Sequence, residues 1–250
     1  MTRSPLRSMR HCVSSCPWVN ILACRLASLS YQLMSGRKIS TKTEAAETLE
    51  ATRQTQAERR ETAERAILEA AKTIVAERGL DALTLHEAGE AAGYSRALPG
   101  HYFGTKSALV SALADHIIAG YAVRVREAVG PADGLDRLCE RLSFYFDDCA
   151  RDPVTARAFQ GILSAGLTRS ELAPIVERLN RDSVDGLAEI IKLARDKGEI
   201  RADARPRAEA SLILASMRGV MFQWLTVPDH VSLSRMRDAL VTNIRRSLAR

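Results

Sequence analysis

Residues 84–109 have the sequence TLHEAGEAAGYSRALPGHYFGTKSAL, and this stretch decides the fold. Thr84 stands where its hydroxyl can accept from the first free amides of a helix, and Glu87 three residues later predicts a capping box. A glycine ends that helix, and Ser95 after the corner is placed to cap a third, short helix from Arg96 to Tyr102. Two short helices joined by a tight corner that contains glycine are typical of a helix-turn-helix, whose second helix enters the major groove of DNA.

A preceding helix is predicted by apolar residues at helical spacing, which form one stripe and stop at a glycine able to take positive φ. Beyond Lys106 each apolar segment again has the helical period, and the sequence contains no convincing strand or internal repeat. The sequence therefore predicts an all-α protein whose N-terminal part is a three-helix head. The residues that predict the first helix are Ile67, Leu68, Ala71, Ile74, Val75 and Gly79.

The residues from Arg65 to Leu109 closely resemble, in order and spacing, the DNA-binding head of the tetracycline-repressor (TetR) family. The resemblance implies a helix-turn-helix DNA-binding domain over residues 59–106. It also implies a C-terminal helical ligand-binding and dimerisation domain over residues 107–250, which would regulate the head. We interpret residues 1–58 as a disordered or mis-annotated leader followed by a flexible arm.

The recognition helix departs from the family's usual pattern at Pro99, where an aliphatic residue is common, and at Gly100, where a tyrosine is common. The usual Ile-Ala pair is Ala88-Gly89 here, and a usual glycine is Ala97. We expect Pro99 to remove an early helical hydrogen bond and to shorten or kink the helix. Gly100 lacks the phenol that family members place on the phosphate backbone.

Arg96 is the residue best suited to form a bidentate hydrogen bond with a guanine edge or a phosphate through its guanidinium. Thr84 and Lys106 stand at helix starts, where free amides favour a phosphate. Leu98 is either a contact to a thymine methyl or a core residue, and Tyr102 either donates to the backbone or packs inward. The predicted DNA-contacting residues are Thr84, Ser95, Arg96, Ala97, Leu98, Gly100, His101, Tyr102 and Lys106.

The C-terminal half contains large apolar residues with a few polar handles, a composition that suits a pocket for an organic ligand. For each of these residues a place in the ordinary core is the competing interpretation. The predicted ligand-binding residues are Tyr121, Phe144, Tyr145, Phe159, Met217, Met221, Phe222 and Trp224.

The segment 208–225 is apolar almost all round, which predicts a helix buried on both sides. One face would pack inside the protomer and another on a partner subunit, as the last two helices do in the TetR family. On the final helix, Leu240 and Ile244 are one turn apart, and we expect them to meet their symmetry mates in a homodimer.

The formal net charge of +6 is misleading as a sign of nucleic-acid binding. Residues 1–43 contain seven arginine and lysine residues and no acid, so residues 44–250 carry a net charge of −1. DNA binding is therefore predicted from the local placement of charge rather than from the net charge.

Residues 1–33 are rich in arginine and serine, and we interpret them as translated leader upstream of a start at Met34. A functional disordered segment and a targeting peptide are the alternatives. Their apolar run is too short to cross a membrane. Residues 35–58 are polar, as in a solvated tail or a basic arm that contacts DNA. The five cysteines match no common zinc spacing, and their odd number argues against a disulfide framework, so we expect a reducing cytoplasm.

We expect a cytoplasmic homodimeric transcription regulator, a repressor that a small-molecule ligand releases from a palindromic operator in double-stranded DNA. The sequence contains no catalytic constellation and no cofactor fingerprint, so we predict neither an enzyme nor a cofactor. His86 and Glu90 are spaced as on a metalloprotease helix, but the second histidine is missing, and no metal site is predicted. Two alternatives stay open: a helical enzyme whose head binds a partner, and a DNA-binding protein without an effector.

Overall fold

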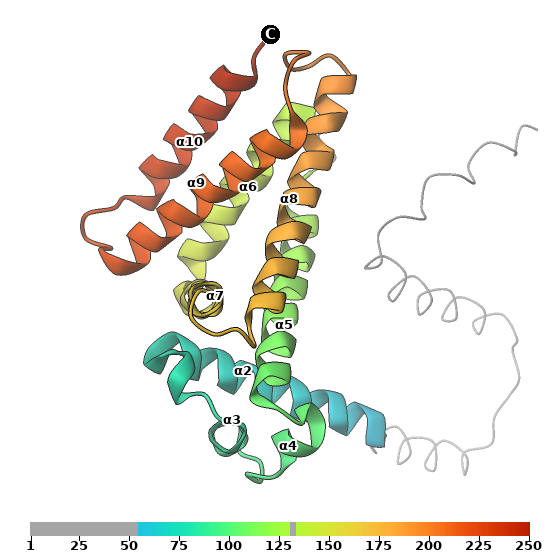
Figure 1. Cartoon of the computed structure of the whole chain (residues 1–250), viewed down its shortest axis with the longest axis vertical. Coiled ribbons are helices and arrows are strands. Elements are labelled where there is room, and N and C mark those ends of the chain that lie inside the picture. The colour runs from blue at the N-terminus through green and yellow to red at the C-terminus, as the bar shows by residue number, and fades with distance from the viewer. Residues whose placement is uncertain (1–54, 131–133) are drawn as a thin grey trace, which may run out of the picture. The chain divides into compact units, whose positions relative to one another are not determined.

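A computed structural model describes residues 55–130 and 134–250, which form nine α-helices and no strand. The prediction of an all-α protein is confirmed. Figure 1 shows α3 and α4 at one end of these residues, with α9 and α10 toward the other. The helices are α2 (Gln56–Ala82), α3 (Leu85–Ala91), α4 (Leu98–Phe103), α5 (Lys106–Ala128), α6 (Gly134–Arg151), α7 (Pro153–Ala165), α8 (Ala173–Asp196), α9 (Pro206–Thr226) and α10 (Leu233–Leu248). The expectations for residues 1–33 and 35–54 lie outside the described part of the chain.

The start of α2 is a capping box that the sequence analysis missed. The backbone amide of Glu58 donates to the Thr55 hydroxyl over 3.2 Å, and the Thr55 amide donates to the Glu58 carboxylate over 2.7 Å. These two bonds satisfy two of the donors that every helix leaves free at its N-terminus. The predicted end of this helix at Gly79 is a kink with φ of 80°, after which helical turns continue to Ala82.

The N-terminal cap of α3 contains one of the two hydrogen bonds that the predicted capping box requires. The Glu87 amide donates to the Thr84 hydroxyl over 3.0 Å, which confirms Thr84 as the N-cap. The predicted return bond from the Glu87 side chain is wrong, because that carboxylate accepts instead from Arg78 of α2 at 2.5 Å. A charge-assisted bond is stronger than a bond to a neutral amide, so the ion pair wins and joins α3 to α2.

The start of α4 differs from the prediction. Ser95 does not cap the helix, because α4 begins at Leu98 after Ala97, and no side chain caps it. Pro99 is the second helical residue, where a backbone amide has no partner inside the helix. The expected loss of a helical hydrogen bond at Pro99 is therefore wrong. Pro99 is instead a buried residue of the head.

Gly89 and Pro99 form a close contact between α3 and α4. A Cβ atom at Gly89 would lie 2.8 Å from the Ser95 carbonyl oxygen and 2.9 Å from Pro99 Cδ. Both distances are shorter than real Cβ contacts, and neither a carbonyl nor a proline ring moves away easily. The small residue at position 89 therefore lets the corner and the proline approach α3, so these two departures from the family pattern belong together.

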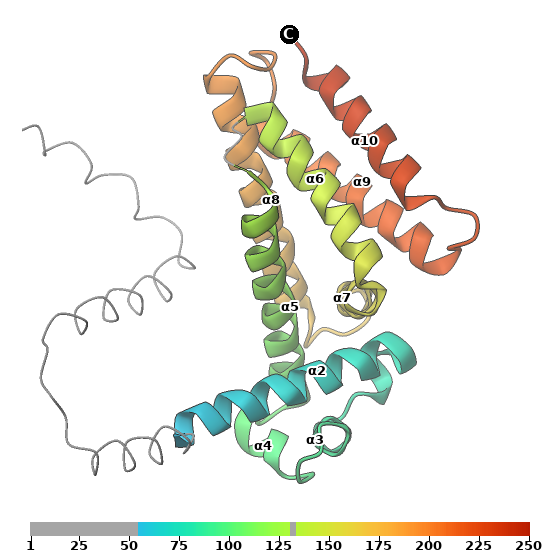
Figure 2. The same ribbon diagram turned by 180° about the vertical axis from the view of Figure 1, so that it is seen from behind.

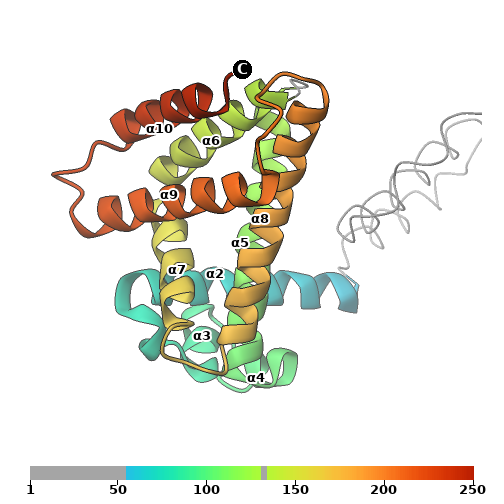
Figure 3. The same ribbon diagram turned by 45° about the horizontal axis from the view of Figure 1, so that its top comes forward.

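The first core joins the head to the helices that follow it. Ile67 and Val75 of α2, Leu109 and Leu113 of α5, and Ile162 of α7 are all buried in this cluster. Figure 3 shows α7 crossing α2, and α2 packs more extensively on α7 than on any other described helix. The helix-turn-helix is therefore not an independent module, since its longest helix shares side-chain packing with the C-terminal half.

By length and composition alone, α5 is apolar enough to cross a membrane. Its apolar residues Leu109, Leu113 and Ile117 are buried inside the first core. One such helix is weak evidence for a membrane span, and these three side chains have apolar partners in the first core.

The second core lies between α6, α8, α9 and α10, and Figure 2 shows α6 beside α10. Met217, Val220 and Met221 of α9 all point into it, whereas Leu212 is 67% exposed and Phe222 is 53% exposed. The helix therefore has an inner face in the second core and an outer face that carries Leu212 and Phe222.

On α10 the expected interface residues point the other way. Ile244 is buried in the second core and Leu240 is partly buried against it. The expectation that these two side chains meet their symmetry mates is therefore wrong. The stripe on α10 is the inner face of this helix, because its partner is α6 of the same chain.

We predict that Gly89→Ala lowers the free energy of unfolding by about 1–3 kcal/mol, because the added methyl overlaps the Ser95 carbonyl and the Pro99 ring. The measurement is chemical denaturation of the full chain. Gly100→Ala is the control, since a Cβ there meets nothing within 4 Å and alanine favours the helix. Equal stability of the Gly89→Ala variant and the wild type would contradict the close contact.

Candidate nucleic-acid interface and regulatory site

The predicted DNA-contacting residues fall into an exposed and a partly buried group. Thr84, Ser95, Arg96, Ala97 and His101 are exposed on the corner and the two short helices. Leu98, Gly100, Tyr102 and Lys106 are partly buried. Leu98 and Tyr102 pack against the first core, so their apolar parts hold α4 in place.

Arg96 lies in the corner before α4 and is held by Glu90 of α3. Its Nε and Nη2 donate to the two Glu90 oxygens over 3.1 and 3.0 Å. The hydrogen bond from Arg96 lowers the pKa of the Glu90 carboxyl below its ordinary value, so the pair is charged at neutral pH. Both side chains are more than half exposed, and the bidentate bond orients the guanidinium without hiding it from solvent. Glu90 entered the sequence analysis only as a possible metal ligand, and its role beside Arg96 was missed.

Tyr102 is covered by a cation that the sequence analysis missed. The guanidinium of Arg60 from α2 lies 5.2 Å from the centre of the Tyr102 ring. His101 and Phe103 stack at an angle on the same ring, at 5.7 and 6.5 Å between centroids. Only the tertiary structure places Arg60, 42 residues earlier in the chain, next to α4.

Lys106 turns toward α2 rather than straight outward. Its Nζ donates to the Asp81 backbone carbonyl over 3.4 Å, and burial lowers the pKa of its ammonium group. The neighbouring cap is Thr105, whose hydroxyl accepts from the Ala108 amide over 3.1 Å. The start of α5 is therefore tied both to its own cap and to the end of α2.

Three of the predicted ligand-binding residues form one aromatic cluster between α5 and α6. Tyr121 lies 5.9 Å from Phe144 and 6.2 Å from Tyr145 between ring centroids. Burial raises the pKa of Tyr121 to about 12, and burial raises the pKa of Tyr145 well above its ordinary value. Burial also raises the pKa of the Cys149 thiol to about 12, and Tyr145 is hydrogen-bonded to it. The phenols of Tyr121 and Tyr145 and the thiol of Cys149 are therefore neutral throughout the physiological pH range.

The other predicted ligand-binding residues are not part of this cluster. Phe159 packs partly buried against the first core, while Met217 and Met221 belong to the second. Trp224 is partly buried against the second core, and Phe222 lies on the outer face of α9.

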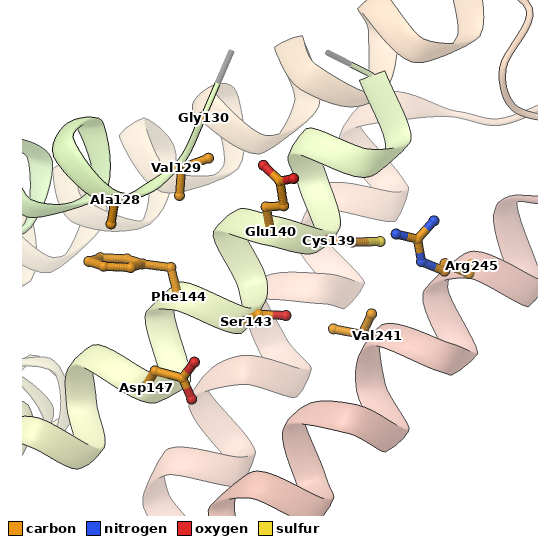
Figure 4. A pocket seen from close by; sticks show the side chains of 10 residues that line it. All are labelled: Ala128, Val129, Gly130, Cys139, Glu140, Ser143, Phe144, Asp147, Val241 and Arg245. Atoms are coloured by element: carbon orange, nitrogen blue, oxygen red, sulfur yellow. The ribbon is translucent and has the colours of Figure 1, made fainter. Parts of the chain in front are cut away.

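A cavity of about 400 Å³ opens between α6, α10 and the end of α5. Figure 4 shows its side chains, with Cys139 of α6 and Arg245 of α10 pointing toward each other. Phe144 is the one predicted ligand-binding residue in the wall of this cavity. The sequence analysis missed the polar residues of the wall. The sequence contained a signal for three of these polar residues. Glu140, Ser143 and Asp147 of α6 are three and four positions apart and therefore share a helix face. The cavity is lined by Ala128, Val129, Gly130, Cys139, Glu140, Ser143, Phe144, Asp147, Val241 and Arg245.

Asp148 is the one buried charged side chain among residues 55–130 and 134–250. Arg124 of α5 donates to its two carboxylate oxygens over 2.9 and 2.8 Å. This bidentate ion pair joins α5 to α6 directly beside Cys149 and the aromatic cluster. The hydrogen bond to Asp148 raises the pKa of Arg124, so its guanidinium stays charged.

Two protein-family models match the chain. The model described as bacterial regulatory proteins of the tetR family matches residues 67–113, which include the helix-turn-helix. The model described as the C-terminal part of a BetI-type transcriptional repressor matches residues 134–249. No curated protein matches the chain in sequence.

Solved structures with the same fold are numerous. A putative TetR-family transcriptional regulator from Rhodococcus sp. is 24% identical, with a TM-score of 0.69 over 75% of this chain and 98% of that one. SmeT, the repressor of the Stenotrophomonas maltophilia multidrug efflux pump SmeDEF, is 21% identical, with a TM-score of 0.63 over 75% and 90%. FadR from Bacillus subtilis in complex with stearoyl-CoA is 17% identical, with a TM-score of 0.63 over 72% and 96%. At these identities the likeness establishes the fold.

We predict that Asp148→Asn lowers the free energy of unfolding by about 1–3 kcal/mol, because it leaves one partner of a partly buried ion pair uncompensated. Asp147→Asn is the matched control on the same helix. Its ion pair with Arg237 is half exposed, so we expect a loss within about 1 kcal/mol. Urea denaturation of both variants makes the comparison, and equal losses would show that the Arg124 ion pair does not hold α5 on α6.

Proposed function

We propose that this chain, which belongs to the TetR family of bacterial transcriptional regulators, is a cytoplasmic repressor that binds a palindromic operator as a homodimer and responds to a small-molecule ligand. The observation that carries the proposal is the corner between α3 and α4. Ser95 and Arg96 are exposed in this corner, and His101 is exposed on α4, which follows it.

For DNA binding we assign α4 to the major groove, with its preceding corner closest to the bases. Arg96 contacts a guanine or a phosphate through the same two nitrogen atoms that now bond Glu90, so binding exchanges one bidentate partner for another. Ser95 and Thr84 hydroxyls and the His101 ring serve the phosphate backbone, which positions the head without reading sequence. Arg60 over Tyr102 adds a cation beside the same helix.

For dimerisation we assign the outer face of α9. Ala208, Leu212, Ala215, Gly219 and Phe222 follow one another at spacings of three and four and are all exposed. Small residues let a second helix approach closely, while the two large ones supply apolar area that is seldom left in water. A two-fold axis across this face pairs the stripe with its own copy.

For ligand response we assign the aromatic cluster and the neighbouring cavity. Support comes from proteins of similar fold, since solved complexes include FadR with stearoyl-CoA and SmeT with triclosan. The first core provides a route from this region to the head, because α7 packs on α2 and Arg169, after α7, forms an ion pair with Asp81. A ligand that prefers one arrangement of these helices shifts the population of DNA-binding dimers by its differential affinity.

We predict that sequences selected from a random duplex pool by the full chain contain two inverted half-sites, roughly one helical turn apart or slightly more. Arg96→Ala should weaken binding to the selected site by about 1–3 kcal/mol if the side chain reads a base. Affinity should also fall steeply with salt, because phosphate contacts release counterions. Fluorescence anisotropy with the selected site and with random DNA gives both quantities.

Arg246→Ala is the control for charge, since Arg246 is exposed on α10 within the second half of the chain. Equal losses on selected and random DNA would assign Arg96 to a phosphate rather than to a base. Absence of binding to any duplex would overturn the proposed function.

We predict that the double substitution Leu212→Glu with Phe222→Glu gives folded monomers, because both side chains are exposed in the protomer and would place like charges across the two-fold axis. Sedimentation velocity measures the association state, and circular dichroism confirms that the helices persist. Leu167→Glu is the control, as Leu167 is 89% exposed outside α9 and should leave the dimer intact. A double variant that still sediments as a dimer would place the interface elsewhere.

A further inference from the structure

The ion pair of Glu90 with Arg96 joins the two elements of the head that the proposed function brings to DNA. Glu90 lies near the end of α3, and Arg96 lies in the corner before α4. Arg96 Nε donates to Glu90 Oε2 over 3.1 Å, and Arg96 Nη2 donates to Glu90 Oε1 over 3.0 Å. Both side chains remain more than half exposed. A surface that receives the guanidinium of Arg96 therefore also receives the carboxylate of Glu90.

The carboxylate of Glu90 bonds the corner and no helix of the head. Within the described residues, Arg96 is the one side chain that donates to it, and Arg96 precedes α4. Glu87 of the same helix differs, because Arg78 of α2 donates to its carboxylate over 2.5 Å and ties α3 to the longest helix of the head. Glu87 is thus a structural acid, whereas Glu90 places an exposed negative charge beside the residue proposed to contact DNA.

When Arg96 binds DNA, Glu90 loses its partner. The two nitrogen atoms that Arg96 offers to a guanine are those that now bond Glu90. A released carboxylate close to the phosphates of a duplex is repelled unless a hydrogen-bond donor faces it. Bases present two such donors in the major groove, the amino groups of cytosine and adenine, and adenine adds an acceptor, N7, beside its amino group. A carboxylate therefore matches cytosine better than any other base.

We propose that Glu90 reads a cytosine in the base pair next to the guanine that Arg96 contacts, so that the two side chains recognise neighbouring bases as a unit. The proposal rests on the proposed function, with Arg96 on a base rather than on a phosphate. The bonded atoms of the two side chains are 3.0 and 3.1 Å apart, which is close to the roughly 3.4 Å between consecutive base pairs. Arg96 fills the guanine edge in the plane of its own pair, and Glu90 then falls on the neighbouring pair.

Selection of bound sequences from a random duplex pool by the full chain tests the assignment. For the wild type we expect each half-site to contain a guanine next to a second G·C pair. Glu90→Ala should lose the preference at one of these two positions. Glu90→Gln should change that position from cytosine to adenine, because a glutamine amide both donates and accepts and so matches adenine N6 and N7. Selected sequences that are the same for both variants as for the wild type would overturn the proposal.

Glu87→Gln is the matched control, since it makes the same change of charge on α3 at a carboxylate that Arg78 binds. It should leave the selected sequences unchanged. Arg96→Ala should relax the guanine position, directly beside the position that the Glu90 variants change. If the positions affected by Arg96 and by Glu90 are separated by one or more base pairs, the two side chains do not read DNA as a unit and the proposal is wrong.

Fluorescence anisotropy gives the size of the effect with three duplexes: the selected site, the same site with thymine in place of the cytosine, and a random sequence. Thymine presents an acceptor there, so we expect the wild type to bind the thymine site about fivefold or more weakly. Glu90→Ala should bind both sites equally and should bind the random duplex more tightly than the wild type, because a negative charge near the phosphates is removed.

The random duplex also separates recognition from a structural role, since a damaged head would lose affinity for it rather than gain affinity. A wild type that binds no duplex contradicts the proposed function itself. A wild type that prefers its selected site but binds the cytosine and thymine sites equally contradicts only the role of Glu90.

Discussion

The packing of α2 on α7 and α5 is the constraint on which the rest of the structure depends. Ile67 and Val75 face Leu109 and Ile162 in one core, so the longest helix of the DNA-binding head is also part of the regulatory half. Side chains packed at this density do not deform continuously, and a shift of α7 must move α2 with it. Ion pairs at the edge of this contact, such as Arg169 with Asp81, contribute little to the stability of the fold, because Asp81 is exposed to solvent.

Within the head, a second close contact sets the position of the recognition helix. Gly89 allows the Pro99 ring and the Ser95 carbonyl to approach α3 more closely than a side chain would permit. The proline then occupies a helix position that needs no amide hydrogen, so the contact forms without loss of a helical bond. Departures that look disruptive when taken singly are compatible when the two residues are in contact.

The charged side chains differ in how far they are exposed to solvent, and this exposure decides what each one contributes. Arg96 with Glu90 is an exposed pair, which water and salt screen, so that replacing Glu90 by another partner costs little. Arg124 with Asp148 is partly buried, bidentate and compensated, so it holds α5 on α6. Arg218 is partly buried as well, and among the described residues its guanidinium donates to a neutral group, the side-chain oxygen of Asn180.

The sequence by itself determined the helices of the head and the Thr84 cap, because these depend on residues a few positions apart, but it missed the cap at Thr55 and wrongly placed one at Ser95. Thr84 caps α3 as its local pattern predicts, and the kink at Gly79 follows from the freedom of glycine. It also named Tyr121 and Tyr145 as ligand-binding residues; the structure brings their rings together, and their binding of a ligand stays a prediction. Only the tertiary structure decided which face of each C-terminal helix points outward. A helical stripe such as that of Ile244 looks the same whether it faces its own core or a partner subunit, and α9 is apolar on nearly every side. The same holds for Arg218 and Arg60, since the group that lies beside a charge depends on contacts between residues far apart in the chain.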